Sequence, residues 1–319
     1  MLLSIAIGSV VIPLKTVLQV LFNSGVGDAG FSTFTTIIWE LRIPRTILMI
    51  LAGAALAGSG CAYQGLFRNP LADPYLIGAA SGAGLGAILA ITIHWPASLF
   101  GFLTVPLAAF AGAVLTVLIV FAVSRVGKTT PITTLILAGV AVSSFATALT
   151  SFLLINASGE LRRALVWLVG GSTLSGWMPV LGAAPYILIG LITLLNMGHT
   201  LNVLQFGDEQ ARQLGLRVPL LRTLIILAAT LTTAAAVAFT GIIGFVGLIV
   251  PHVMRNLWGG DYRRLLPLSI IGGASFLLAA DILSRILLAP QELPVGIITA
   301  LAGAPFFLLL LRKSKQQYW

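Results

Sequence analysis

Long apolar blocks separated by short polar breaks constrain the fold of this chain more than any other feature. Residues 132–155, for example, contain no charged side chain. Each block is close to the ~20 residues that a helix needs to cross a bilayer. A soluble domain carries about a quarter charged residues, whereas Asp, Glu, Lys and Arg together make up only 8% of this chain. The sequence therefore predicts an all-α, polytopic membrane protein.

We expect about ten transmembrane helices, at 1–12, 46–66, 76–93, 104–124, 132–155, 180–197, 223–240, 242–257, 266–288 and 296–311. The first segment is too short to cross the membrane, so either the true start lies upstream or the first helix is truncated. All segments belong to one transmembrane domain, 1–319. Two of its longer breaks are a cytoplasmic loop at 198–222 and an external loop with a short helix at 156–179.

Basic residues are distributed unequally between the two sets of alternate loops, and this predicts the orientation in the membrane. The richer set holds Arg68, Arg125, Lys128, Arg212, Arg217, Arg222, Arg255, Arg263, Arg264, Arg312, Lys313 and Lys315, and the poorer set holds Lys15, Arg42, Arg45, Arg162, Arg163 and Arg285. The positive-inside rule places the richer set, and with it both chain ends, in the cytoplasm. This topology accounts for the net charge of +9. No basic patch interleaved with aromatic residues indicates a nucleic-acid partner.

The placement of ionisable residues argues against two other function classes. No predicted segment carries an acidic residue or a histidine near its centre, whereas an ion-coupled secondary transporter generally needs such groups at membrane depth. A membrane-embedded enzyme needs a nucleophile, a base or metal ligands that converge, and the sequence offers no such group. We therefore expect no catalytic residue and no metal site. Asp281 and Arg285, one helical turn apart, are expected to pair with each other.

Residues 122–129 match the loosest form of a phosphate-binding loop. That loop needs a strand before it and a glycine at its first position, but here an apolar segment precedes it and the first position is Ala122. We therefore expect no ATP binding and no other cofactor on this chain. The only cysteine, Cys61, excludes a disulfide within the chain.

Segment 132–155 differs from the others because it carries a stripe of hydroxyl groups. The stripe consists of Ser143, Thr147 and Thr150 on one face, with Ser144 and Ser151 beside it. An uncharged polar stripe can line a wide passage for a large solute, and it can equally make interhelical hydrogen bonds. The sequence alone leaves both interpretations open.

Two breaks contain residues that interrupt a helix. "RNPLADP" at 68–74 has Asn-Pro and Asp-Pro steps, and "GFVGLIVPH" at 244–252 has a glycine and a proline within an apolar run. Helices of transporters are often broken where they line a cavity. In contrast, "GDEQARQLGL" at 207–216 reads as a helix of a soluble protein, with acids in its first turn, Arg212 one turn later and Gly215 to end it.

The chain resembles the permease subunits of ABC importers for iron–siderophores, haem and cobalamin. The motifs that carry this resemblance are "RIPRT" (42–46), "LAGAALAGSGCAYQGLFRNPLADPYLIG" (51–78), "GDEQARQLGL" (207–216), "GIIGFVGLIVPHVMR" (241–255), "AADILSR" (279–285) and "ELPVGIITALAGAPFF" (292–307). The resemblance implies a ten-helix permease of a bacterial or archaeal cytoplasmic (inner) membrane, working as a homodimer. It also implies two separate ATPase subunits that hold ATP and Mg²⁺, and an external substrate-binding protein.

The resemblance also implies roles for particular residues. The external docking arginines fall on Arg42, Arg45 and Arg285, and the gating helix falls on 132–155. The ATPase-coupling helix falls on Gly207, Asp208, Glu209, Gln210, Arg212, Gln213, Leu214, Gly215 and Leu216. A ferric siderophore is the first choice of substrate, with haem or cobalamin as alternatives. Arg162 and Arg163, in the short external helix near 161–170, either meet the negative charge of the chelate or belong to an amphipathic surface helix.

Overall fold

The computed structural model describes residues 1–8, 10–22, 29–93, 101–125, 127, 130–155, 157, 159–171 and 175–315. Its elements are α1 (Leu2–Ala6), α2 (Leu14–Leu21), α3 (Ala29–Thr36), the π-helix η1 (Ile37–Arg42), α4 (Ile43–Phe67), α5 (Ala79–Thr92), the 3₁₀ turn η2 (Gly101–Leu103), α7 (Thr104–Val123), α8 (Ile132–Ile155), α9 (Leu161–Leu168), α10 (Trp177–Asn196), α11 (Gly198–Leu204), α12 (Asp208–Gln213), α13 (Val218–Thr240), α14 (Val246–Trp258), α15 (Tyr262–Ile286) and α16 (Val295–Lys315). The described part of the chain is thus all-helical.

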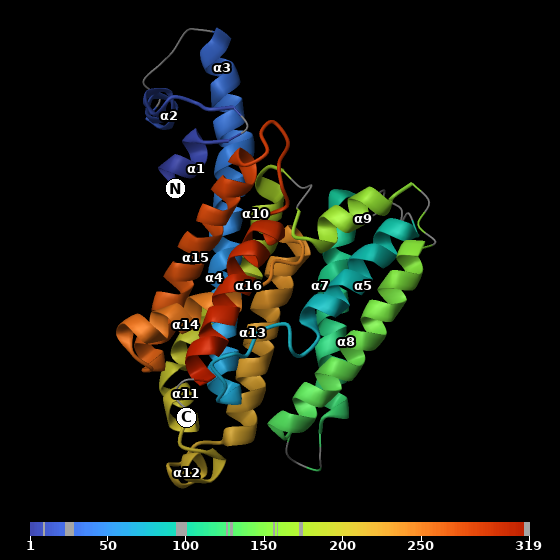
Figure 1. The fold of residues 1–319 in the computed structure, drawn as a ribbon, viewed down its shortest axis with the longest axis vertical. Helices are drawn as coiled ribbons and strands as arrows, with labels where there is room; N and C mark the ends of the chain where they lie inside the picture. The colour runs from blue at the N-terminus through green and yellow to red at the C-terminus, as the bar shows by residue number, and fades with distance from the viewer. Residues whose placement is uncertain are drawn as a thin grey trace.

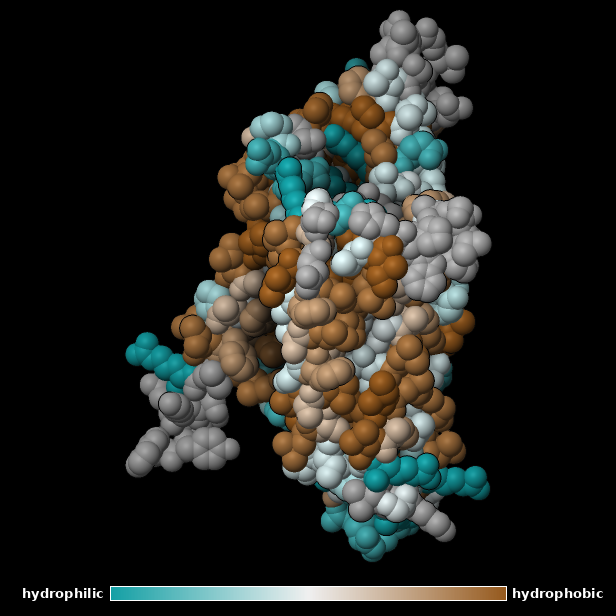
Figure 2. Space-filling model, turned by 90° about the vertical axis from the view of Figure 1, so that its right-hand side faces the viewer, coloured by the Kyte–Doolittle hydropathy of each residue, from teal (hydrophilic) through white to brown (hydrophobic). Residues whose placement is uncertain are grey.

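The helices have the length and composition of a polytopic membrane protein. Six stretches of the described chain are long and apolar enough to cross a bilayer: Thr33–Phe67, Gly101–Val123, Ile132–Ile155, Trp177–Asn196, Val218–Thr240 and Tyr262–Ile286. Two shorter apolar helices, Ala79–Thr92 and Val295–Leu310, accompany them. Figure 2 shows a broad apolar band between more polar ends on the face of the molecule that it presents. Together with α14, these helices account for nine of the ten predicted segments.

The helices form two groups that lie side by side (Figure 1). One group contains α4, α10 and α13 to α16, the other contains α5, α7 and α8, and α13 packs against α7 and α5 to join them. In the most apolar part of Thr33–Phe67, the stretch that contains α4, 83% is buried inside the protein. The corresponding share in α8 is 22%. The bundle therefore encloses α4, whereas α8 turns most of its surface outward.

Close helix contacts depend on small residues where α5 packs against α7. A Cβ atom added to Gly86 would overlap the backbone carbonyl of Ala108 in α7, and one added to Gly82 would overlap that of Gly112. Backbones can approach this closely only where no side chain separates them. The pair α5 and α7 is therefore fixed by backbone-to-backbone packing.

Helices α5 and α14 are shorter than predicted because non-helical chain precedes each of them. Residues 76–78, predicted as helix, continue the irregular stretch 68–78, which ends at Gly78 with φ 88°. Residues 242–245 likewise lie outside α14, and Phe245 adopts a left-handed conformation with φ 70°. A bulky residue in this region is uncommon and costs free energy. Both irregular stretches therefore depend on tertiary contacts.

The first predicted segment, 1–12, does not cross the bundle. Only Leu2–Ala6 is helical within it, and Met1 lies at the end of the molecule opposite α12, whereas α16 runs toward the α12 end (Figure 1). The prediction that both chain ends share one side is therefore not met by Met1. The physical reason is that the buried guanidinium groups of Arg42 and Arg285 need hydrogen-bond acceptors. Carbonyl groups between residues 4 and 10 supply these acceptors and so hold the start of the chain at this end.

Candidate functional site

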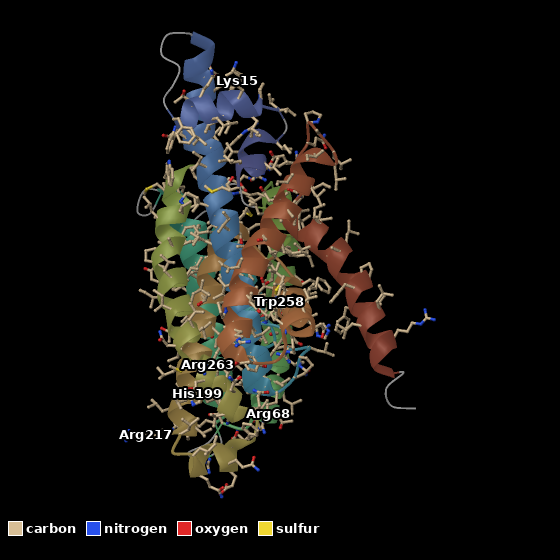
Figure 3. All side chains as sticks on the ribbon, turned by 90° about the vertical axis from the view of Figure 1, so that its left-hand side faces the viewer. Lys15, Arg68, His199, Arg217, Trp258 and Arg263 are labelled. Carbon is tan, nitrogen blue, oxygen red and sulfur yellow. The ribbon has the colours of Figure 1, made fainter. Side chains whose placement is uncertain are left out.

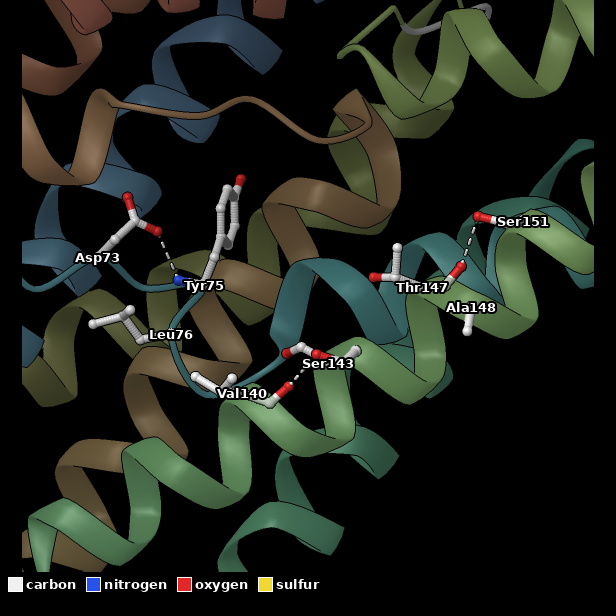
Figure 4. Close-up of a pocket in the computed structure, with 9 residues that line it drawn as sticks. Asp73, Tyr75, Leu76, Val140, Ser143, Thr147, Ala148 and Ser151 are labelled. Atoms are coloured by element: carbon white, nitrogen blue, oxygen red, sulfur yellow. Dashed lines mark hydrogen bonds between the residues drawn. The ribbon is translucent and has the colours of Figure 1, made fainter.

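An open recess of about 670 Å³ lies between α8 and the irregular stretch 68–78 (Figure 4). Asp73, Tyr75 and Leu76 line it on one side, and Val140, Ser143, Ser144, Thr147, Ala148 and Ser151 of α8 line it on the other. Four of the five predicted stripe residues therefore lie on a common surface. Apart from Asp73, the lining is uncharged.

The fifth stripe residue, Thr150, does not reach the recess. It is 7% exposed and donates a hydrogen bond to the carbonyl of Ala146 at 2.8 Å. Ser144 and Ser151 also donate to carbonyl groups of their own helix. The hydroxyls of Ser143 and Thr147, in contrast, form no hydrogen bond with any described residue, although both line the recess. Two hydroxyls of the stripe, those of Ser143 and Thr147, therefore face the recess unpaired. The other three bond within α8, so the stripe does not join α8 to a neighbouring helix of the described chain.

The stretch 68–78 contributes two site residues that the sequence analysis did not assign. Asp73 accepts a hydrogen bond from the backbone amide of Tyr75 at 2.8 Å, which closes a local turn. The Tyr75 hydroxyl donates to the carbonyl of Ile243 at 2.9 Å. The available signal was the "RNPLADP" motif, which predicted a break but not which of its side chains would face a cavity. The two predicted helix breaks therefore meet beside the recess.

Helix α12 lies at one end of the molecule and is short and largely exposed (Figure 1). Gly207 precedes it with φ 107°, and Gly215 ends it with φ 84°. The amide of Gly215 donates to the carbonyl of Arg212 at 2.9 Å, and that of Leu216 donates to Ala211 at 3.0 Å, the pattern of a Schellman cap. The predicted helix and its glycine terminator are therefore both confirmed.

The side chains of α12 divide into an inward set and an outward set. Ala211 is buried and Asp208 is half-buried, whereas Glu209, Gln210, Arg212, Gln213 and Leu214 are exposed. Leu214 in particular is 65% exposed. An apolar side chain is therefore exposed at this end of the bundle.

Other basic residues also lie at the α12 end. Figure 3 shows Arg68, His199 and Arg217 there, with Lys15 at the opposite end. Also near this end, Asp261 accepts hydrogen bonds from the side chain of Asn202 at 2.6 Å and from the amide of Arg263 at 3.0 Å. These bonds hold the pKa of Asp261 below its usual value. The carboxylate thus caps α15 and fastens it to α11.

Two of the three predicted docking arginines pair with Asp281, whose side chain is 0% exposed. Arg45 pairs with it at 2.9 Å and Arg285 at 2.8 Å. Arg42, 9% exposed, and Arg285, 3% exposed, also donate to carbonyl groups of residues 4–10. Arg45 is the most exposed of the three, with 34% of its side chain accessible and a second ion pair to Glu292 at 2.6 Å. All three arginines make contacts within the chain, and Arg45 differs from the other two in the exposure of its side chain.

Helix α9 lies at the end of α8 that is farther from α12 (Figure 1). Arg162 and Arg163 are exposed on it, whereas Ala164 and Trp167 are buried. Arg163 forms an ion pair with Glu160 at 3.8 Å, a distance at which an exposed pair contributes little. The amphipathic surface helix considered from the sequence is therefore present, and its charged face is open to a solute.

Comparison with known proteins identifies the family. The profile of the FecCD transport family matches residues 1–313. The chain is 46% identical to the cobalamin import system permease protein BtuC of Halobacterium salinarum, over 88% of this chain and 74% of that protein. It is 40% identical to the hemin transport system permease protein HmuU of Yersinia pestis, over 94% and 89%. A solved structure described as a metal-chelate type ABC transporter in an inward-facing conformation superimposes with a TM-score of 0.78 at 33% identity, covering 94% of this chain and 96% of that one.

These matches fit the chemistry of the described residues. No group of three or more His, Cys, Asp or Glu side chains that could hold a metal ion occurs in the part of the chain that the structure describes. As a permease subunit the chain is not itself catalytic and binds no cofactor, and its family implies an ATPase and a substrate-binding protein as partners. The chain belongs to the FecCD transport family, the permeases of prokaryotic ABC importers for iron chelates, haem or cobalamin.

Proposed function

We propose that this permease carries a ferric siderophore inward along the recess between α8 and the 68–78 stretch. The observation that carries the proposal is the unpaired, outward-facing hydroxyls of Ser143 and Thr147 beside Asp73. Polar groups and irregular backbone at membrane depth are tolerated where they line a water-filled cavity, but not where they face lipid tails. A large, polar chelate needs a passage with this kind of surface.

A second copy of the chain is the partner that completes the passage. The recess is open on one side, and α8 also exposes Leu137, Val140, Phe145 and Phe152. Apolar residues that flank a polar stripe suit two copies of α8 that face each other across a two-fold axis, since closed cyclic dimers are the commonest oligomers. The homodimer would surround the hydroxyls on all sides and exclude lipid from them.

Energy would enter at α12, on the cytoplasmic side. The exposed residues of this helix, with Leu214 at its tip, form a contact for an ATPase subunit. The binding protein would dock at the opposite end, where 34% of the Arg45 side chain is exposed. Arg42 and Arg285 would contribute by holding that surface in place, because both are buried and donate to carbonyl groups of the chain.

The charge of the outer surface favours an anionic chelate. Arg162 and Arg163 project from α9, and the recess below carries one acidic side chain, Asp73. An anionic ferric siderophore or the propionates of haem could contact these arginines through charge-assisted hydrogen bonds. A siderophore is the proposed substrate, and haem and cobalamin are the alternatives that the experiment distinguishes.

The test is reconstitution of the chain in liposomes with its ATPase and binding protein. Uptake of a labelled ferric siderophore is expected with the active ATPase and not with a hydrolysis-deficient ATPase. Haem and cobalamin are offered in parallel, so uptake of either one in place of the siderophore would correct the substrate. Uptake that persists without ATP hydrolysis would overturn the importer mechanism itself.

A further inference from the structure

Asp208, the first residue of α12, connects three parts of the chain. The Nη2 group of Arg222 lies 3.0 Å and 2.8 Å from its two carboxylate oxygens. The guanidinium of Arg68 approaches the same carboxylate at 3.4 Å. An acid in the first turn of a helix often interacts only with the helix dipole. Here, instead, the carboxylate bridges one arginine on α13 and another at the end of α4.

Arg222 extends this connection to the gating helix α8. It is 8% exposed, and its Nη1 group donates to the backbone carbonyl of Thr130 at 3.0 Å. Thr130 precedes Pro131, after which α8 begins at Ile132. One guanidinium therefore binds α12 through one nitrogen and the start of α8 through another. The planar fork of arginine fixes both contacts in one geometry, which a lysine cannot reproduce.

Arg68 leads from the same carboxylate to the other wall of the recess. It follows the last residue of α4 in a left-handed conformation with φ 52°. The irregular stretch 68–78, with Asp73 and Tyr75, begins at this residue. The two walls of the proposed passage are therefore both tied, at their α12 ends, to Asp208.

The surroundings leave these connections room to shift. A cavity of about 550 Å³ lies beside Asp208 and Arg222 and is also lined by Arg125, Arg212 and Pro219. An exposed ion pair would contribute little to stability and need have no further role. This pair differs because Arg222 is buried and its second nitrogen binds a carbonyl at the start of a different helix.

We propose that Asp208 and Arg222 are positioning residues that convert a displacement of α12 into a displacement of the start of α8 and of the 68–78 stretch. The proposal rests on the proposed function, in which an ATPase moves α12. The contacts would act as a rigid link, so that hydrolysis opens or closes the passage. Without the link, the ATPase would still bind the exposed residues of α12, but its motion would not reach the passage.

The test compares Arg222→Gln and Arg222→Lys with Arg217→Gln in the reconstituted complex. Arg217 is exposed and forms no ion pair with any described residue, so it is a matched control for loss of one positive charge at the same end. We expect both Arg222 variants to hold the ATPase and to hydrolyse ATP, while substrate transported per ATP falls about ten-fold. We expect Arg217→Gln to keep the wild-type ratio. A purely structural role for Arg222 would lower hydrolysis and transport together.

A distance measurement reports the link directly. Spin labels at Gln213→Cys in α12 and Thr133→Cys in α8, with Cys61→Ser to remove the native thiol, should keep their separation on ATP binding, because a rigid link moves both helices together. We expect the separation to change in Arg222→Gln, where α12 moves without α8. If Arg222→Gln assembles poorly, Arg222→Lys replaces it, because it keeps the charge.

The outcomes separate this proposal from the proposed function. A wild-type complex that takes up no substrate with an active ATPase would overturn both. A wild-type complex that transports, together with an Arg222→Lys variant that keeps both the wild-type transport per ATP and the constant separation of the labels, would overturn the link alone.

Discussion

The hydroxyl of Tyr75 donates to the carbonyl of Ile243 at 2.9 Å and so joins the two irregular stretches of this permease. Ile243 is 1% exposed, so its carbonyl depends on donors within the protein. This single bond connects the wall of the recess to the chain that leads into α14. The two breaks that the sequence predicted separately thus form one structural unit.

Removal of the Tyr75 hydroxyl should weaken the contact between the two irregular stretches. Tyr75→Phe keeps the ring but removes the hydroxyl, and we expect the free energy of unfolding to fall by about 1 kcal/mol. Denaturation of the purified protein in detergent measures the effect. Tyr186→Phe is the matched control, because the Tyr186 side chain is 47% exposed and packs against Phe110 through its ring. Equal stability of the two variants would contradict this role of Tyr75.

Loss of the Asp281 charge should destabilise the protein strongly. Asp281→Asn leaves Arg285, 3% exposed, without its buried counter-charge, and we expect a loss of about 3–5 kcal/mol. Glu292→Gln removes the other partner of Arg45, but that carboxylate is 39% exposed. Its loss should cost less than about 1 kcal/mol. Similar unfolding midpoints for the two variants would show that Asp281 is not the main partner of these two arginines.

Two glycines of α5 should respond differently to the same added methyl group. Gly86→Ala places Cβ against the backbone of Ala108, which cannot move aside, and should cost about 1–3 kcal/mol. Gly84→Ala meets only the ends of two flexible side chains, Leu168 at 3.3 Å and Ile242 at 3.6 Å. It should be neutral or slightly stabilising, because alanine favours helix over glycine. Thermal unfolding of both variants measures the difference, and a tolerated Gly86→Ala would contradict the backbone contact.

A large side chain in the recess should block transport without affecting assembly. Thr147→Trp fills the space between α8 and Tyr75, so we expect uptake to fall while the ATPase still co-purifies and hydrolyses ATP. Ile189→Trp, on the outward face of α10 where Ile189 is 59% exposed, controls for the added bulk. Normal uptake by Thr147→Trp would place the passage elsewhere.

The sequence was sufficient for features that depend on neighbouring residues. Nine of the ten predicted segments correspond to helices, because apolar length is a local property and a bilayer accepts few alternatives to a helix. The ends of α12 were predictable for the same reason, since Gly215 acts within its own turn. Four of the five stripe residues in α8 share the recess, because helical periodicity fixes which positions lie on one face.

Only the tertiary structure decided what the polar side chains contact. The sequence indicated that Asp281 pairs with Arg285, four positions away, but not with Arg45, 236 positions away. It assigned Asp208 to a helix terminus, whereas the fold places Arg222 and Arg68 around its carboxylate. It also read residues 1–12 as a membrane segment, although buried arginines hold them at one end of the bundle. The sequence thus determined the helices, since these depend on local periodicity. The packing of those helices determined the charge networks, because an ion pair requires proximity in space and not in the chain.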